Sequence, residues 1–195
     1  MKYYTKLIIM ALALIIFKNL PLMAQTKPLR IEISQGVIEP MPIALSKFMA
    51  VGDISVKYSE KISSVIMADL VGSGLFREIP RSAHISTATD FNLPVQFADW
   101  RVINADALIT GSGNIQGDKL ILKFRLFDVF AQTALGEGLQ FQANKNSWRR
   151  MAHKISDAVY SRLTGEAAYF DSRVAYISEK GPKNARKKRL TIMDY

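Results

Sequence analysis

Residue types that commonly carry catalysis are sparse in this sequence. Its 195 residues include two histidines, His84 and His153, and no cysteine. Neither histidine belongs to an HExxH motif or stands at metal-ligand spacing from the other, and thiol chemistry is excluded. His84 lies in a polar segment that predicts a loop, and His153 lies on the polar side of a predicted helix. We therefore predict no catalytic residue, no metal site and no cofactor.

Two serines are flanked by glycines, but neither motif fits a known catalytic pattern. Gly72-Ser73-Gly74 and Gly111-Ser112-Gly113 both depart from the GxSxG motif of serine hydrolases. The glycines at 111, 113 and 117 also miss the dinucleotide-binding GxGxxG pattern by one position and lie between predicted strands. Tight turns are the favoured interpretation of both clusters.

Four aspartates lie close to apolar segments and leave one enzymatic alternative open. Two carboxylates brought together by the fold can perform general acid–base hydrolysis, and scattered sequence positions do not exclude such a pair. Capping or ion pairing is the favoured interpretation. The periplasmic hydrolase with a carboxylate pair stays as the alternative. The four residues are Asp69, Asp106, Asp128 and Asp157.

The N-terminus has the pattern of a secretory signal peptide. Lys2 and Lys6 precede an uncharged apolar run over residues 7–17, and the small residue Ala24 lies beyond it. We expect cleavage between Ala24 and Gln25, so that residues 1–24 are a signal peptide and the protein is periplasmic. The run is shorter than the ~20 residues that span a bilayer, although an uncleaved, inner-membrane-tethered module stays as an alternative.

The net charge of +9 is concentrated at the two ends of the sequence. Three lysines lie in the leader, and residues 180–189 contain six basic residues and no acidic one, so residues 25–179 carry only +1. Nucleic-acid binding needs a basic footprint on a folded surface, so we predict no nucleic-acid partner. The basic run is interpreted as a solvated hairpin loop, with anionic lipid or an acidic partner as the alternative.

Hydrophobic periodicity predicts the elements that would position these residues. Apolar residues at helical spacing indicate a helix over 60–73 capped by Ser59, a short helix over 97–104 that buries Phe97 and Trp100, and a helix over 145–163. The last of these begins at Asn144 or Asn146, carries Trp148 on its apolar stripe and ends at Gly165.

Alternating and short apolar segments predict strands. They cover residues 29–34, 43–49, 76–79 and 107–109, then a meander through 119–130 and 134–143, and finally a hairpin of 173–178 with 189–194. The fold class is α/β (α+β type), with a mixed sheet of about five strands packed with two long helices and followed by the hairpin. A hairpin alone is marginal in water, so it should belong to a larger assembly.

Several ordered stretches of the sequence resemble the TolB family, the periplasmic proteins of the Tol-Pal system. The resemblance is carried by RIEI at 30–33 with Gly36, PI at 42–43, ADL at 68–70 with SG at 73–74, Trp100 before ADAL at 105–108, LFDV at 126–129, WR at 148–149 with AHKISD at 152–157, LTG at 163–165, RVAY at 173–176 and MDY at 193–195. Their order and spacing extend over nearly all of the sequence behind the leader.

This resemblance implies a non-enzymatic adaptor that links inner- and outer-membrane components, maintains outer-membrane integrity and supports invagination during cell division. We expect the protein to be a monomer. The resemblance also implies an N-terminal α/β domain at 25–165 and an incomplete first blade of a β-propeller at 166–195, with the chain truncated at Tyr195. A Pal-like lipoprotein would bind the propeller, most of which is expected to be missing. A TolA-like inner-membrane protein would bind Gln25, Thr26, Lys27, Pro28, Leu29, Arg30, Ile31, Glu32 and Ile33. Residues 29–34 alternate between apolar and polar, so they could add a strand to a partner or serve as an edge strand of their own domain.

Overall fold

The computed structural model describes residues 39–50, 53–86 and 90–194. The leader with its expected cleavage site at Ala24 and Gln25, the predicted partner-binding segment Gln25–Ile33 and the predicted strand at 29–34 all lie outside the described residues. Within the described ranges, no helix is both long enough and apolar enough to cross a membrane.

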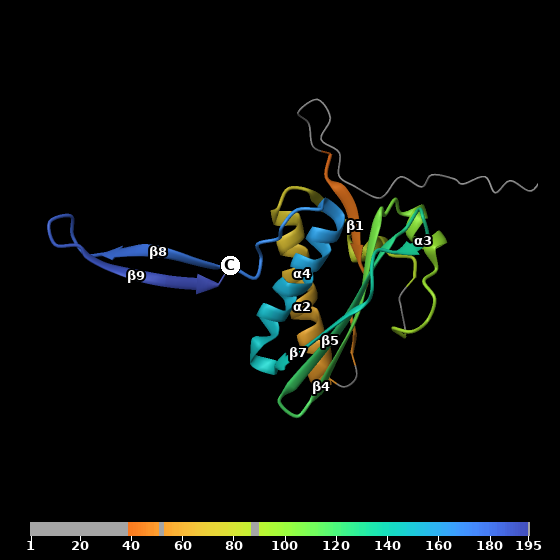
Figure 1. Cartoon of the computed structure of the whole chain (residues 1–195), viewed down its shortest axis with the longest axis horizontal. Helices are drawn as coiled ribbons and strands as arrows, with labels where there is room; N and C mark the ends of the chain where they lie inside the picture. The colour runs from red at the N-terminus through yellow and green to blue at the C-terminus, as the bar shows by residue number, and fades with distance from the viewer. Residues whose placement is uncertain (1–38, 51–52, 87–89, 195) are drawn as a thin grey trace, which may run out of the picture.

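A mixed seven-stranded sheet forms the centre of the fold (Figure 1). Strand β1 lies between β3 and β4 and is parallel to both, whereas β5 is antiparallel to β4 and pairs at its other edge with β6 and β7. The short β2 also pairs with β4. The strands are β1 (Met41–Leu45), β2 (Met49–Ala50), β3 (Phe76–Glu78), β4 (Ala107–Gln116), β5 (Lys119–Asp128), β6 (Thr133–Ala134) and β7 (Leu139–Asn144).

The predicted meander is confirmed in its centre and divided at its end. β4 and β5 form a hairpin around Gly117, whose φ of 61° is the left-handed conformation that favours glycine. Alternate residues of β5 are buried, as predicted: Leu120, Leu122, Phe124 and Leu126. The strand predicted at 134–143 is interrupted, because Gly136 also has a positive φ and separates β6 from β7.

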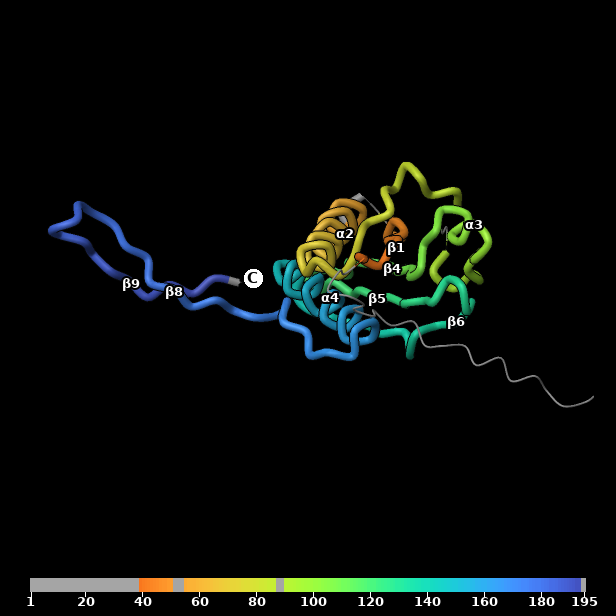
Figure 2. The backbone as a smooth tube through the Cα atoms, turned by 90° about the horizontal axis from the view of Figure 1, so that it is seen from above, coloured from red at the N-terminus to blue at the C-terminus, as the bar shows by residue number. Residues whose placement is uncertain are grey.

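Two long helices cover one face of the sheet, as predicted. Helices α2 (Asp53–Gly72) and α4 (Trp148–Thr164) lie side by side on that face, and the short helix α3 (Phe97–Val102) lies on the other (Figure 2). Alternation within β1 sends Ile43 into the core under the long helices and Ala44 into a smaller core with Trp100 of α3. The sheet is therefore buried on both faces at β1, whereas β5 and β7 alternate between buried and more exposed residues.

The start of α2 differs from the prediction. The helix begins at Asp53, before the predicted start, and Ser59 is a buried residue in its interior and not its cap. Ser55 and Ser59 are both buried, because α2 approaches β4 too closely there for large side chains: a Cβ built on Gly113 would lie 2.9 Å from the Ser59 hydroxyl. Small polar residues replace the apolar stripe in this part of the helix, so hydrophobic periodicity does not detect it.

The ends of α4 follow the sequence signals. The Asn144 side chain accepts a hydrogen bond of 2.9 Å from the Asn146 backbone N–H, in a 3₁₀ turn (Lys145–Ser147) that precedes the helix. Gly165 ends the helix with a φ of 78°, as predicted. Trp100 is buried as expected, whereas Trp148 is only partly buried and lies edge-on to Tyr58.

Gly111 and Gly113 correct another prediction. They lie inside strand β4 and not in a turn, and their role is close packing. A Cβ on Gly111 would meet the Phe48 ring at 2.2–2.6 Å. The Phe48 ring is 1% exposed and occupies the space that any larger residue at 111 would need. These glycines therefore allow Phe48 and α2 to contact the sheet directly.

The predicted C-terminal hairpin is confirmed and is longer than expected. Strands β8 (Arg173–Lys180) and β9 (Lys187–Asp194) form a two-stranded sheet of their own, which extends away from the α/β body (Figure 1). The connecting segment is attached to that body, because Phe170 is fully buried in the main core beside Tyr160. The core therefore continues past the predicted domain boundary at Gly165.

Candidate interaction sites

A buried polar pair connects the two long helices and corrects the prediction for His153. Its Nδ1 lies 2.8 Å from Oδ2 of Asp69, and the two side chains are 5% and 6% exposed. His153 is not on a solvated face, because α4 is covered on one side by the sheet and on another by α2 (Figure 2). A helix with two buried sides needs a polar partner for any polar residue between them, and Asp69 of α2 is that partner.

Two of the other aspartates close to apolar segments, Asp128 and Asp157, bind backbone groups, as the capping interpretation predicts. Asp128 accepts a hydrogen bond of 2.7 Å from the Ala131 N–H and stabilises the turn after β5. Asp157 accepts hydrogen bonds of 2.8 and 3.2 Å from the N–H groups of Phe170 and Asp171. Asp157 therefore fastens the connection to the hairpin onto α4.

Asp106 and Asp128 are the closest approach to a carboxylate pair. Burial raises the pKa of Asp106, the negative charge of Asp128 raises it further, and Arg77 opposes both effects. The two acids lie at the end of the β4–β5 hairpin, where Ala107 pairs with Asp128, and Asp69 lies elsewhere, between the helices. Among the described residues, no three of the types His, Cys, Asp and Glu gather closely enough to hold a metal ion.

The raised pKa of Asp106 predicts a pH-dependent stability. Because the folded state holds the Asp106 proton more tightly than the unfolded state, this group favours folding at low pH, and that contribution is lost as the pH rises through the pKa in each state. The Asp106→Asn variant should therefore be more stable than the parent chain at neutral pH, by about 0.5 kcal/mol for a partly exposed group. Urea unfolding at neutral pH and below the ordinary pKa of aspartate measures the difference, which should vanish at low pH.

The exposed Asp118 supplies the matched control for this variant. Lys145 lies 2.7 Å away and lowers the pKa of Asp118, so this carboxylate favours folding above its ordinary pKa and the contribution is lost as the pH falls. Asp118→Asn should change stability in the opposite direction to Asp106→Asn. If both variants change stability in the same direction, the electrostatic explanation for Asp106 is wrong.

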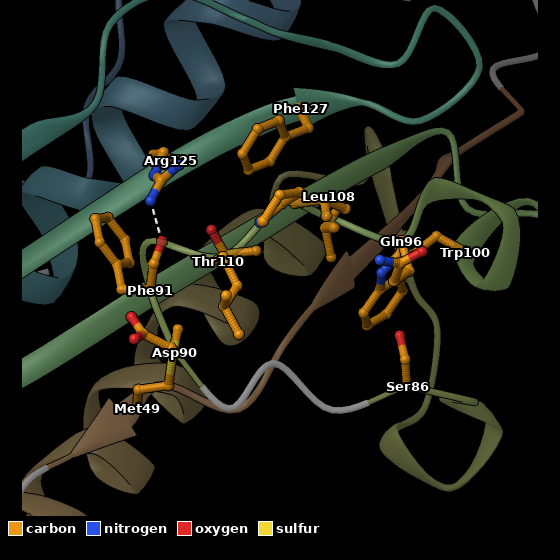
Figure 3. A pocket seen from close by; sticks show the side chains of 13 residues that line it. Met49, Ser86, Asp90, Phe91, Gln96, Trp100, Leu108, Thr110, Arg125 and Phe127 are labelled. Carbon is orange, nitrogen blue, oxygen red and sulfur yellow. Dashed lines mark hydrogen bonds between the residues drawn. The ribbon is translucent and has the colours of Figure 1, made fainter.

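An apolar pocket of about 230 Å³ lies on the side of the sheet opposite the long helices (Figure 3). Leu108 and Thr110 of β4 and Phe127 of β5 line it, together with Trp100 of α3 and the segment that precedes α3. This volume lies below the range of about 300–1,000 Å³ that is usual for small-molecule sites.

Arg125 holds the loop at the mouth of this pocket. Its guanidinium lies 4.2 Å from the centre of the Phe91 ring and donates a hydrogen bond to the Phe91 carbonyl (Figure 3). The sequence did not indicate this contact, because alternation along residues 119–130 places Arg125 opposite the apolar face of its strand and the polar segment that contains His84 predicts a loop. Phe91, a large aromatic residue within that polar segment, is the sequence feature that could have indicated the contact.

Comparisons with known proteins agree on one family. The sequence model of the TolB amino-terminal domain matches residues 29–135. The chain is 55% identical over 186 residues to the Tol-Pal system protein TolB of Cereibacter sphaeroides (strain ATCC 17029 / ATH 2.4.9), covering 95% of this chain and 42% of that protein. It is 60% identical over 169 residues to the protein of the same name from Dinoroseobacter shibae, covering 86% and 38%.

A solved structure shows the same fold. The crystal structure of TolB from Acinetobacter baumannii superimposes with a TM-score of 0.62 at 24% identity, covering 85% of this chain and 38% of that one. This chain spans about two fifths of the length of the curated relatives that it matches.

Proposed function

The chain belongs to the TolB family, and from this premise we propose that it is a non-enzymatic adaptor of the Tol-Pal system in the periplasm. In this proposal the chain links inner- and outer-membrane components, and through that link it maintains the outer membrane and supports envelope invagination during division. Its relatives carry the name Tol-Pal system protein, which supports a role in that system.

The observation that carries the proposal is the range of residues that the family model matches. The match begins at residue 29 and so includes the end of the segment Gln25–Ile33 that we propose as the site for a TolA-like protein. This segment precedes β1, which is held between two neighbouring strands in the middle of the sheet. A partner could therefore pair with the segment without disturbing the core, by adding a strand.

Three of the four aspartates have structural roles, which supports an adaptor over a hydrolase. Asp69 binds His153, whereas Asp128 and Asp157 bind backbone N–H groups, so each has a structural role. The proposed second partner is a Pal-like lipoprotein that binds a β-propeller, of which β8 and β9 would be the first two strands. A mass measurement of the exported chain distinguishes cleavage at Ala24 from an uncleaved membrane tether.

The test of the proposal is the affinity of the exported chain for a TolA-like inner-membrane protein. Changing Ile31 and Ile33 together to aspartate should lower the affinity about 100-fold, because two isoleucines would lose their apolar burial at the partner. Isothermal titration calorimetry measures the change. Circular dichroism of the free variant establishes that its fold is intact.

The matched control for this variant lies on the other side of the same segment. Glu32 alternates with the two isoleucines, so the Glu32→Gln variant should bind within about threefold of the parent chain if the segment binds as a strand. Unchanged binding by the isoleucine variant would overturn the assignment of this segment. Equal losses in the variant and the control would exclude strand pairing.

A further inference from the structure

The two faces of the β8–β9 hairpin differ in whether their basic side chains have an acidic partner. Side chains directly opposite each other lie on one face, and alternate residues lie on opposite faces. On one face Glu179 lies opposite Lys188 and forms ion pairs of 2.9 Å with Lys188 and 2.6 Å with Arg186. These two cations lower the pKa of Glu179. The acid nearest the tip of the hairpin is therefore fully engaged on this face.

The opposite face, which we name the cationic face, carries Lys180, Lys187 and Arg189. Lys180 lies directly opposite Lys187, and Arg189 lies opposite Ser178 in the next pair on the same face. All three cations are exposed, and none has an acidic partner within ion-pair distance among the described residues. Like charges directly opposite each other destabilise a strand pair, so a bound anion would relieve a repulsion that is built into the hairpin.

The cationic face is hollowed near the turn. The three cations line a shallow cleft of about 520 Å³ together with Ser178, Gly181, Pro182 and Ala185. Lysine and arginine are the side chains that bind phosphate oxygens best. The chemistry of the cleft therefore fits phosphate groups.

We propose that the cationic face docks this protein onto an anionic phospholipid surface through the phosphate groups of the lipids. A single free phosphate binds weakly to exposed lysines because water and salt screen the attraction, whereas a charged lipid surface presents many phosphates at once. The turn between β8 and β9 carries no large apolar side chain, so the contact is electrostatic and peripheral.

The position of the hairpin also fits a lipid surface better than a nucleic acid. The tip extends away from the α/β body, so a flat surface can reach it without contact to the helices (Figure 1). Nucleic acids are bound by basic grooves that follow the backbone, yet residues 25–179 carry a net charge of only +1. The available charge is local to one end of the molecule.

Vesicle co-sedimentation of the full exported chain tests the proposal. The chain should bind vesicles that contain phosphatidylglycerol and should not bind vesicles of phosphatidylcholine alone. Changing Lys180, Lys187 and Arg189 together to glutamine should lower the partition coefficient about 100-fold, since each basic residue near an anionic surface changes it about fivefold. Raising the salt concentration should weaken the binding of the parent chain.

The matched control removes three positive charges from the α/β body and leaves the hairpin unchanged. Lys47, Lys119 and Lys123 are exposed, and changing all three to glutamine should leave the partition coefficient within about threefold of the parent value, because these residues lie away from the hairpin. Equal losses in the two triple variants, or undiminished binding by the hairpin variant, would overturn the proposal. Circular dichroism establishes the fold of each variant.

Two further measurements distinguish the source of the phosphate. Inorganic phosphate at the same salt concentration should not displace the chain from vesicles, and displacement would assign the cleft to free phosphate. A labelled DNA duplex should bind more weakly than the vesicles. Tighter DNA binding that is lost in the hairpin variant would replace the lipid surface with a nucleic acid.

Discussion

The His153→Ala variant is expected to lose about 3 kcal/mol of unfolding free energy, because a buried carboxyl without its partner costs about 1–3 kcal/mol and the cavity left by the imidazole adds to the loss. The imidazole lies 2.8 Å from the Asp69 carboxyl between α2 and α4, and both groups are almost fully shielded from water. Removing the imidazole leaves the carboxyl buried without this partner and opens a cavity between the helices. Urea unfolding followed by circular dichroism measures the loss.

The other histidine, His84, is the matched control for this prediction. His84 is half-buried, lies 3.2 Å from the Ile79 carbonyl and packs edge-on against Trp100, so the His84→Ala variant should lose only about 1 kcal/mol. The Asp69→Ala/His153→Ala double variant should lose less than the sum of its single variants, because the pair acts as a unit. Additive losses, or equal losses for the two histidines, would contradict this account of the helix interface.

The Gly111→Ala variant is expected to lose about 2–3 kcal/mol, since overpacking a well-filled core forces side chains out of their preferred positions. The added methyl group would lie 2.2 Å from the nearest atom of the Phe48 ring, and that ring is buried on all sides. Thermal unfolding should show the loss as a decrease in Tm of about 5–10 °C.

Another glycine and a second-site change provide the controls for this prediction. A Cβ on Gly72, the last residue of α2, meets nothing within 4 Å, so the Gly72→Ala variant should be as stable as the parent or slightly more stable. Replacing the Phe48 ring with a smaller side chain, in the Phe48→Leu/Gly111→Ala double variant, should recover part of the lost stability. A Gly111→Ala variant with unchanged Tm would show that Phe48 does not lie over β4 in solution.

Periodicity and turn chemistry predict much of this fold from the sequence. The alternation in residues 119–128 predicts the central strand with its buried face, Gly165 predicts the end of α4, and the hairpin strands follow from short apolar segments. Each of these signals is local, because a strand or a helix end is determined by the residues within a few positions of it.

Features that depend on contacts between distant elements could not be predicted in this way. His153 has a polar type and a helical position that suit solvent, and only the packing of α4 against α2 shows that it is buried. Ser59 and Gly111 are small because another element lies against them, and a small residue carries no periodic signal. The pocket beside Arg125 likewise forms only when β4, β5 and α3 come together.

Hydrogen–deuterium exchange of the chain, alone and bound to a TolA-like protein, tests the central claim most directly. The account predicts that binding protects amides within residues 25–33, with the strongest protection alternating along the segment as in an added strand. The sheet and the pocket beside Arg125 should exchange as they do in the free chain. Protection confined to the pocket or to the hairpin, with none within residues 25–33, would contradict the account.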